Sequence, residues 1–595
     1  MSRTWKASLL ALAVLAASCA SSHRGGAQQA PAGCTVVDMA ASPEKYDLLS
    51  GLAAAFNSSP ESRRGGCAFV RLNKQSSGAA ASLLADGWPD PAVNGARPAV
   101  WSPAASAWGA ILNQRLAGRG QPAEAQADAK PLWVTPLTIA MPKPMAEALG
   151  YPQTPIGYAD LVNLARNPAG WGGKGHPEWG PFRLGKTNPN LSTSALNATV
   201  AQYYAATGKV RDLSLEDVER PDVAAYNRSV ESAVVHYGDT TLTFLDNLLR
   251  NDVRGSALTY VSAVAVEEKS VLDYNRGIPS GAAPAGETPR PPRVPLVAVY
   301  PKEGTLLSDN PFYVLDAPWV TAETRRAART FEVFLQKPDS QRRALAAGFR
   351  PGNPAVALGP PIVPSSGVDP AQPQTTLGVP APPVLVRLIQ KWVETRKGAR
   401  VLMVIDVSGS MGDQAAPGKT KLDLVKDAAI RALDQFKGDD EVGLRIFSTA
   451  VGPAEHTDYA DAVPIGPLGP EKQQLAAKIG GLSPVAGTPL YTVTNVSYDQ
   501  LKASFNGTRI NAVLLLTDGM NEDPRNNDLD GLVRNLRAGS EGQSAVPVRV
   551  FTIGYGHDAD LATLRRISEA TNASAYDASD PTTIDKVFTA VVSNF

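Results

Sequence analysis

Histidine is scarce in this chain, and the net charge is zero. Only five of the 595 residues are histidines, and 57 basic residues balance 57 acidic ones. A Ser/His/Asp triad therefore has few residues that could serve as its base. The balanced charge gives no electrostatic reason to expect a nucleic acid or an anionic membrane surface as a partner, so we expect no nucleic-acid ligand. The histidines are His23, His176, His236, His456 and His557.

A long apolar run that could span a membrane is also missing. The apolar segment from Ala7 to Leu15 is too short for a spanning helix, and the chain stops at Phe595 without a terminal apolar run. Arg3 and Lys6 precede the first segment, which is the arrangement of a secretory signal. We therefore expect the chain to leave the cytoplasm.

The residues after this segment resemble the lipobox of bacterial lipoproteins. Small residues, Ala16-Ala17-Ser18, stand directly before Cys19, which the resemblance makes the lipidated residue. The sequence departs from the family pattern at Ala16, where leucine is favoured. The resemblance implies a signal peptide over 1–18, a flexible Ser/Gly/Ala/Gln-rich tether over 19–32, and a protein anchored by its lipid on the extracytoplasmic face of the cell membrane. The alternative is a plain secreted protein with an incidental cysteine.

Cysteine is rare as well, with three residues in the chain. If Cys19 is lipidated, Cys34 and Cys67 remain as an even pair in an oxidising compartment, and we expect them to form a disulfide. Closing a loop of about thirty residues would stabilise the fold by roughly 3 kcal/mol in the chain-entropy model.

The most informative segment lies late in the chain, where an aliphatic run starting at Val401 ends in the pattern D-x-S-x-S. Such a run indicates a parallel strand buried on both faces, and open α/β sheets place their ligands at the carboxyl ends of these strands. Asp406, Ser408 and Ser410 would then project from one loop. A carboxylate and two hydroxyls are oxygen ligands, which suit a hard cation such as Mg2+.

Two later segments complete this pattern. Thr488 opens a helical stretch, and a second buried run from Ala512 to Thr517 ends in Asp518-Gly519. The order D-x-S-x-S, Thr, T-D-G resembles the metal-ion-dependent adhesion site of von Willebrand factor type A (VWA) domains. The resemblance implies a doubly wound, Rossmann-like domain over 399–595 that binds Mg2+, or Mn2+ or Ca2+, with one coordination position left for an acidic residue of a protein partner. The implied metal ligands are Asp406, Ser408, Ser410, Thr488 and Asp518.

Other chemistry for this region is less well supported. The segment Gly554 to Ala559 has the G-x-G-x-x-A pattern of a dinucleotide site, but it follows a late strand where that fingerprint belongs on the first. A hydrolase that uses the metal to activate water would need a general base, and the sequence offers none beyond the metal ligands. We therefore predict a binding protein and not an enzyme.

The region 33–350 repeats a pattern of short apolar strand, small-residue loop and helix, with hydroxyl side chains at helix starts. It resembles type 2 periplasmic solute-binding proteins, with the molybdate/sulfate-type branch nearest, which implies a bilobal α/β module that takes a small-molecule or oxyanion ligand. For each residue the alternative is a capped helix without a ligand. The candidate ligand-binding residues are Ser42, Ser76, Ser77, Trp101, Ser102, Ser192, Thr193, Ser194 and Tyr237, the last followed by Gly238 and Asp239.

Two further segments carry structural expectations. Glu267, Glu268 and Asp273 are expected on a solvated helix face. Residues 351–398 are expected to form a Pro-rich connector and then a short amphipathic helix that packs on one domain, since Val384, Leu385, Leu388, Ile389 and Trp392 recur at helical spacing.

The sequence thus predicts a cell-surface lipoprotein that binds a protein partner through Mg2+ and also carries a solute-binding-like module. The alternative is a solute-binding receptor of an ABC-type transport or sensing system, with the VWA-like domain as an accessory.

Overall fold

The computed structural model describes residues 30–238, 240–281, 288–454, 457–540 and 546–595. The predicted signal segment, the lipidation residue Cys19 and most of the predicted tether lie outside the described residues, and so does Asp239. Within the described ranges, no helix is both long and apolar enough to cross a bilayer.

The first lobe is built on a sheet in the order β10-β3-β1-β2, with β1 parallel to both β2 and β3. Pro43 at the first position of α1 fixes the helix start directly after β1. The elements of this lobe are β1 (Thr35–Ala41), α1 (Pro43–Ser58), β2 (Ala68–Lys74), α2 (Ser77–Ala85), α3 (Pro91–Asn94), β3 (Val100–Ser102), α4 (Ala107–Ala117), β10 (Tyr313–Val314), α13 (Ala322–Leu335) and α14 (Pro338–Ala346).

The second lobe has a mixed sheet in the order β11-β4-β7-β5-β6, and β8 and β9 also pair with β4. Its strands are β4 (Trp133–Pro142), β5 (Leu184–Thr187), β6 (Val234–Gly238), β7 (Ala263–Glu267), β8 (Leu296–Val299), β9 (Leu307–Ser308) and β11 (Arg350–Pro351). Its helices are α5 (Lys143–Ala148), α6 (Tyr158–Arg166), α7 (Thr193–Thr207), α8 (Leu215–Glu219), α9 (Pro221–Ser232), α10 (Thr241–Arg254), α11 (Ala257–Tyr260) and α12 (Glu268–Asn275).

A disulfide joins Cys34 and Cys67, whose Cα atoms are 4.4 Å apart. It lies where β1 and β2 begin side by side, since Thr35 pairs with Ala68 and the Thr35 N–H donates to the Cys67 carbonyl at 2.6 Å. The bond therefore links the first two strands of the lobe at their starting ends.

The C-terminal domain has a sheet in the order β16-β15-β12-β17-β18-β19, parallel except for the edge strand β16. The central strands are buried along nearly their whole length, as the apolar runs predict. The strands are β12 (Gly398–Asp406), β15 (Glu441–Phe447), β16 (Tyr459–Pro467), β17 (Arg509–Thr517), β18 (Val548–Tyr555) and β19 (Ala575–Ala578). The helices are α16 (Lys421–Ala432), α17 (Leu468–Gly480), α18 (Leu490–Ala503), α19 (Leu529–Ser540), α20 (Leu561–Ala570) and α21 (Ile584–Val592), and a hairpin of β13 (Gln414–Ala416) and β14 (Lys419–Thr420) precedes α16.

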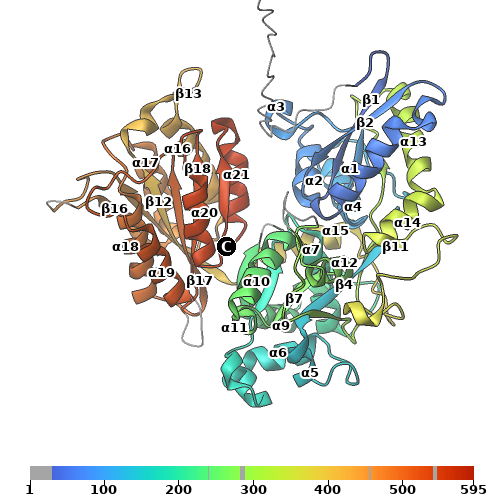
Figure 1. Ribbon diagram of the computed structural model, residues 1–595, viewed down its shortest axis with the longest axis horizontal. Helices are drawn as coiled ribbons and strands as arrows, with labels where there is room; N and C mark the ends of the chain where they lie inside the picture. Colours follow the sequence, from blue (N-terminus) through green and yellow to red (C-terminus); the bar gives the residue numbers. More distant parts are fainter. Residues whose placement is uncertain (1–29, 239, 282–287, 455–456, 541–545) are drawn as a thin grey trace, which may run out of the picture.

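The helix α15 (Pro382–Thr395) precedes the C-terminal domain and contacts both lobes (Figure 1). It packs against α4 of the first lobe and against α7, α8 and α9 of the second. The five apolar residues that predicted this helix are all buried, and they form its core-facing side. The prediction had the helix packing on one domain, and it packs on the bilobal N-terminal region, where it contacts both lobes.

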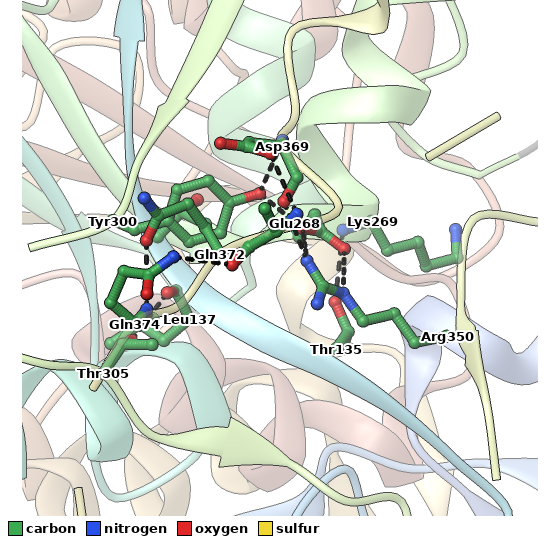
Figure 2. A network of polar contacts seen from close by, with 12 residues as sticks. Thr135, Leu137, Glu268, Lys269, Tyr300, Thr305, Arg350, Asp369, Gln372 and Gln374 are labelled. Atoms are coloured by element: carbon green, nitrogen blue, oxygen red, sulfur yellow. Dashed lines mark hydrogen bonds and ion pairs between the residues drawn. The ribbon is translucent and has the colours of Figure 1, made fainter. Parts of the chain in front are cut away.

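The Pro-rich segment before α15 lies on the second lobe through a polar network (Figure 2). The Arg350 guanidinium donates to both carboxylate oxygens of the buried Glu268, at 2.9 and 2.6 Å. The same guanidinium donates to the Asp369 carbonyl at 3.2 Å, and the Asp369 N–H donates to the Tyr300 hydroxyl at 3.2 Å. Ile362 and Val368 are buried, so the segment is held on the second lobe at these points and by the network around Asp369.

A buried carboxylate, Glu231, connects the second lobe, α15 and the start of the C-terminal domain. It forms an ion pair with the equally buried Lys186. It also accepts hydrogen bonds from the Tyr237 hydroxyl at 2.6 Å and from the Trp392 indole at 3.3 Å. The Tyr237 hydroxyl in turn accepts from the Lys397 N–H at 3.1 Å, one residue before β12. Burying a charge is costly unless it is paired and hydrogen-bonded, and Glu231 meets both conditions.

The last residues of the chain contact the second lobe directly, beside α10 (Figure 1). The Asn594 carbonyl accepts from the Tyr237 N–H at 3.1 Å, and the Ser593 carbonyl accepts from the Asn188 side chain at 3.2 Å. The Asn251 side chain of α10 donates to the Asn572 side chain at 2.6 Å. The C-terminal domain is therefore packed against the second lobe through a defined interface.

Leu385 of α15 provides a test of this packing. It is fully buried, so Leu385→Ala should lower the free energy of unfolding by about 2–5 kcal/mol, through lost burial and a residual cavity. Val393→Ala on the same helix is the control, because Val393 is 36% exposed and should change stability by about 0.5 kcal/mol or less. Urea unfolding of the two variants measures the difference, and equal stabilities would contradict the described position of α15.

Candidate functional site

The predicted metal ligands meet at the carboxyl edge of the C-terminal sheet. β12 and β17 are adjacent and parallel, so Asp406 at the end of β12 and Asp518 directly after β17 lie next to each other. The Ser410 hydroxyl donates to Asp518 Oδ1 at 2.8 Å and lies 3.1 Å from the Ser408 hydroxyl. Asp406 Oδ1 accepts from the Ser408 N–H at 2.7 Å. Four of the five predicted ligands are thus connected by direct hydrogen bonds.

Thr488, the fifth predicted ligand, lies beside the loop that carries Asp518. A Cβ built on Gly519 would lie 3.4 Å from the Thr488 hydroxyl oxygen, which is ordinary contact distance, so this hydroxyl is next to the residue that follows Asp518. Thr488 is buried, and its carbonyl accepts from the Glu522 N–H at 2.8 Å, which fixes the loop. The order of the sequence motif is therefore reproduced as one spatial cluster.

The two carboxylates of this cluster are fully buried. Burial raises the pKa of Asp406 to about 7, and the nearby charge of Asp518 adds to the effect, while hydrogen bonds from Thr517 and Ser408 oppose it. Such a pair favours the approach of a positive charge. The donor set is two carboxylates with three hydroxyls, which fits a hard divalent cation. The described residues contain no group of three or more His, Cys, Asp or Glu side chains placed to hold a metal.

The Lys421 ammonium lies beside this cluster. It donates to Asp518 Oδ2 at 2.8 Å, and the residue is 7% exposed. Burial lowers the pKa of Lys421, but the hydrogen bond and charge of Asp518, helped by Asp413 and Asp558, outweigh it and leave that pKa above its ordinary value. One positive charge therefore already accompanies the two carboxylates.

A second cluster of polar residues lies between the two lobes of the N-terminal region. The lobes touch there, because the Gly78 N–H donates to the Leu191 carbonyl at 3.0 Å and the Thr193 hydroxyl lies 3.2 Å from the Ser77 hydroxyl. The remaining cavity is only about 30 Å³, roughly the space of a single water molecule. In this closed arrangement the cleft has no room for a larger molecule. Its polar lining residues are Glu44, Ser76, Ser77, Ser192, Thr193, Ser194, Thr240, Thr241 and Glu267.

Two carboxylates line this cleft. Glu267 ends β7 and accepts from the Ser194 hydroxyl at 2.5 Å and the Ser308 hydroxyl at 3.3 Å. Burial raises the pKa of Glu267 to about 7, and the charge of Glu44 adds to the shift. Among the described residues that line the cleft, none is a lysine or an arginine.

Comparison with known families gives a direct match to both regions. A family of bacterial extracellular solute-binding proteins matches residues 37–350, more than half of the 595-residue chain. The von Willebrand factor type A domain family matches residues 401–590. The chain belongs to the bacterial extracellular solute-binding proteins. A C-terminal VWA domain follows its solute-binding domain, which confirms the predicted pair of modules and the α/β fold class.

The individual proteins that this chain resembles share only a low sequence identity with it. A Mycobacterium tuberculosis H37Rv protein described as uncharacterized is 26% identical over 553 residues, which is 91% of this chain and 74% of the relative. The sulfate-binding protein SubI from the same organism is 18% identical, with a TM-score of 0.36, over 54% of this chain and 89% of that one. A von Willebrand factor type A structure from Catenulispora acidiphila is 20% identical, with a TM-score of 0.25, over 33% of this chain and 42% of that one.

The structure brings together most of the residues predicted for the solute-binding domain. Ser76, Ser77, Ser192, Thr193 and Ser194 line the cleft. Ser42 lies at its edge, with its hydroxyl donating to Glu44.

Three predicted ligand residues do not line this cavity. Trp101 is buried in the first lobe against Tyr313, with ring centroids 5.7 Å apart. The buried Ser102 hydroxyl donates to the Pro311 carbonyl at 2.7 Å. Tyr237 is used at the domain junction, where it contacts Glu231 and Trp392. The hydroxyls of Ser102 and Tyr237 are thus already hydrogen-bonded inside the protein.

The expectation of a solvated acidic face over Glu267, Glu268 and Asp273 is wrong, because all three side chains are buried. Glu268 pairs with Arg350 and Asp273 with Lys269. The sequence reasoning also missed Glu44 and Lys421. The signal for Glu267 was present, since the apolar run Ala263–Val266 ends in a carboxylate as the metal-domain strands do.

The raised pKa of Glu267 predicts how the stability of the folded protein depends on pH. Its pKa rises from an ordinary 4.5 to about 7 in the folded protein, so between these values the folded state binds a proton that the unfolded state does not. The contribution of Glu267 to the free energy of unfolding therefore increases as the pH falls from 7 toward 4.5, and it is lost above pH 7. The total change is about 3 kcal/mol at most. Glu267→Gln should remove this component, making the variant more stable than wild type at pH 8 and similar at pH 5.

Urea unfolding at the two pH values measures the effect, with the exposed Glu216→Gln as control. Parallel pH profiles for wild type and Glu267→Gln would contradict the buried, raised-pKa state of Glu267.

Proposed function

We propose that this protein binds a protein partner at the cell surface through a divalent cation held by its VWA domain. The observation that carries the proposal is the convergence of Asp406, Ser408, Ser410, Thr488 and Asp518, from three separate loops, into one buried all-oxygen cluster. These residues would hold Mg2+, or Mn2+ or Ca2+. When bound, the ion supplies a positive centre to which a carboxylate of the partner can bind.

The rest of the chain supports a location outside the cytoplasm. Membership in an extracellular solute-binding family indicates an extracytoplasmic protein. We propose further that Cys19 carries the lipid that anchors it to the membrane. Within the VWA domain, the exposed side chain of Met520 is two positions after Asp518, and that of Val485 is two positions before Gly487. Such apolar side chains could pack against residues flanking the partner's carboxylate.

The first test is whether the cluster binds a cation. Asp406→Ala removes the carboxylate at the end of β12, which is one of the two in the cluster, so we expect the heat of Mg2+ binding to disappear in titration calorimetry while the fold is kept. Asp439→Ala is the matched control, since its side chain is 70% exposed on the same domain. An unchanged Mg2+ isotherm for Asp406→Ala would show that the assigned cluster is not the site.

The partner is then tested by its dependence on the metal. Proteins cross-linked to the wild type on cells in Mg2+, but absent both in EDTA and with Asp406→Ala, would be partners of this site. A set of cross-linked proteins that is the same in all three conditions would contradict metal-dependent binding.

A second candidate function is a solute receptor for transport or sensing, which the inter-lobe cleft favours. The described residues that line the cleft supply hydroxyls and two carboxylates and include no basic side chain, so we propose a small neutral or cationic solute in preference to an oxyanion. Binding would require the lobes to separate, because they are in contact around Gly78 and Leu191.

A thermal-shift screen distinguishes the two functions. A ligand at a hundred times its dissociation constant stabilises its domain by about 2.7 kcal/mol. We expect a shift with Mg2+, and, if the receptor function holds, a shift with a small amine, amino acid or sugar. A shift with sulfate or molybdate alone would overturn the proposed solute class.

A further inference from the structure

Lys421 is held in a fixed position beside the candidate metal ligands. It is the first residue of α16, where Thr420 and Asp423 form a reciprocal capping box. Its N–H donates to the Asp413 carbonyl at 2.8 Å. The backbone on both sides is therefore fixed, and the side chain extends over Gly556, where an added Cβ would lie 3.3 Å from Lys421 Cε.

The ammonium group faces carboxylates from three elements. The closest is the buried Asp518 at 2.8 Å, and Asp413 and Asp558 follow at 3.6 and 3.8 Å. These two differ from Asp518 in their surroundings, because their side chains are 64% and 82% exposed. One buried and two exposed carboxylates thus share the same lysine.

This arrangement brings the lysine and a metal ion into competition. Asp518 Oδ1 accepts from Ser410 and Oδ2 accepts from Lys421, so the ammonium already uses an oxygen of a candidate metal ligand. A divalent cation on Asp518 would stand close to the ammonium, and like charges at such a distance repel strongly in a buried site. Asp413 and Asp558 offer the ammonium a place to move that keeps it paired.

We infer that Lys421 is a built-in counter-cation that sets the metal affinity of the VWA domain. In the metal-free protein it neutralises Asp518 and keeps that carboxylate in place. When a divalent cation binds, the ammonium moves to Asp413 and Asp558 at the rim of the site. The affinity of the VWA domain for the divalent cation is therefore lower than the two carboxylates would give without Lys421. This inference rests on the proposed metal site.

Replacing the charge tests this role. In titration calorimetry of the full chain with MgCl2 at pH 8, Lys421→Met should lower the Mg2+ dissociation constant at least tenfold. It should also lower the unfolding temperature without metal and increase the stabilisation that Mg2+ produces, because the metal-free state has lost its counter-cation. Lys421→Arg keeps the charge and should stay within about threefold of wild type.

A second set of variants does not disturb the buried pair and keeps the test valid if Lys421→Met folds poorly. Asp413→Asn with Asp558→Asn changes two exposed side chains and removes the place to which the ammonium moves, so Mg2+ binding should weaken severalfold. The same pair of changes in the Lys421→Met background should have a clearly smaller effect, which a double-mutant cycle measures.

The outcomes separate this inference from the proposed metal site. Unchanged or weaker Mg2+ binding by Lys421→Met, or additive effects in the cycle, would overturn the role of Lys421 while the metal site stands. Absence of Mg2+ binding in the wild type and in every variant would overturn the metal site and the role of Lys421 together.

Discussion

Two carboxylates buried side by side are the feature on which the C-terminal domain depends. Asp406 and Asp518 stand at the ends of adjacent parallel strands, and neither is exposed to solvent. Bringing them together costs free energy unless a positive charge or a proton reduces the repulsion between them. The surrounding loops supply hydroxyl and N–H donors, and Lys421 supplies a charge. The cluster therefore consists of two buried carboxylates whose repulsion is reduced by hydrogen-bond donors and by one positive charge.

The solute-binding domain and the VWA domain are held together by direct contacts and not only by the chain that connects them. Glu231, buried in the second lobe, bonds to Trp392 of the connecting helix and shares Tyr237 with Lys397 before β12. The final residues of the VWA domain bond back to the same lobe. Since α15 also contacts the first lobe, opening the cleft has to change the packing of α15 against one lobe or the other. The packing of α15 therefore links the relative position of the two lobes to the segment that enters the VWA domain.

Short sequence motifs predicted the structure well where the residues of a site are close together in the sequence. The aliphatic run before Asp406 and the one before Asp518 each predict a buried strand with a ligand at its end, and both strands are found. Serines at helix starts likewise pointed to the cleft, where Ser76 and Ser192 lie. Trp101 and Tyr237, which were predicted as ligands near strand ends, pack elsewhere, because aromatic side chains also serve as core contacts and as hydrogen-bond partners at a domain junction.

The sequence alone determined the two modules, their α/β class and the order of the five metal-ligand candidates, because strand periodicity and short loop motifs are properties of neighbouring residues. Only the tertiary structure decided which distant side chains share a site. The pairing of Lys421 with Asp518, the pairing of Glu268 with Arg350 and the burial of Glu267 depend on chain segments far apart in sequence. A sequence does not show whether an acidic side chain is solvated or buried. The protonation and pairing of that side chain are set by the charges and hydrogen-bond donors that folding brings to it.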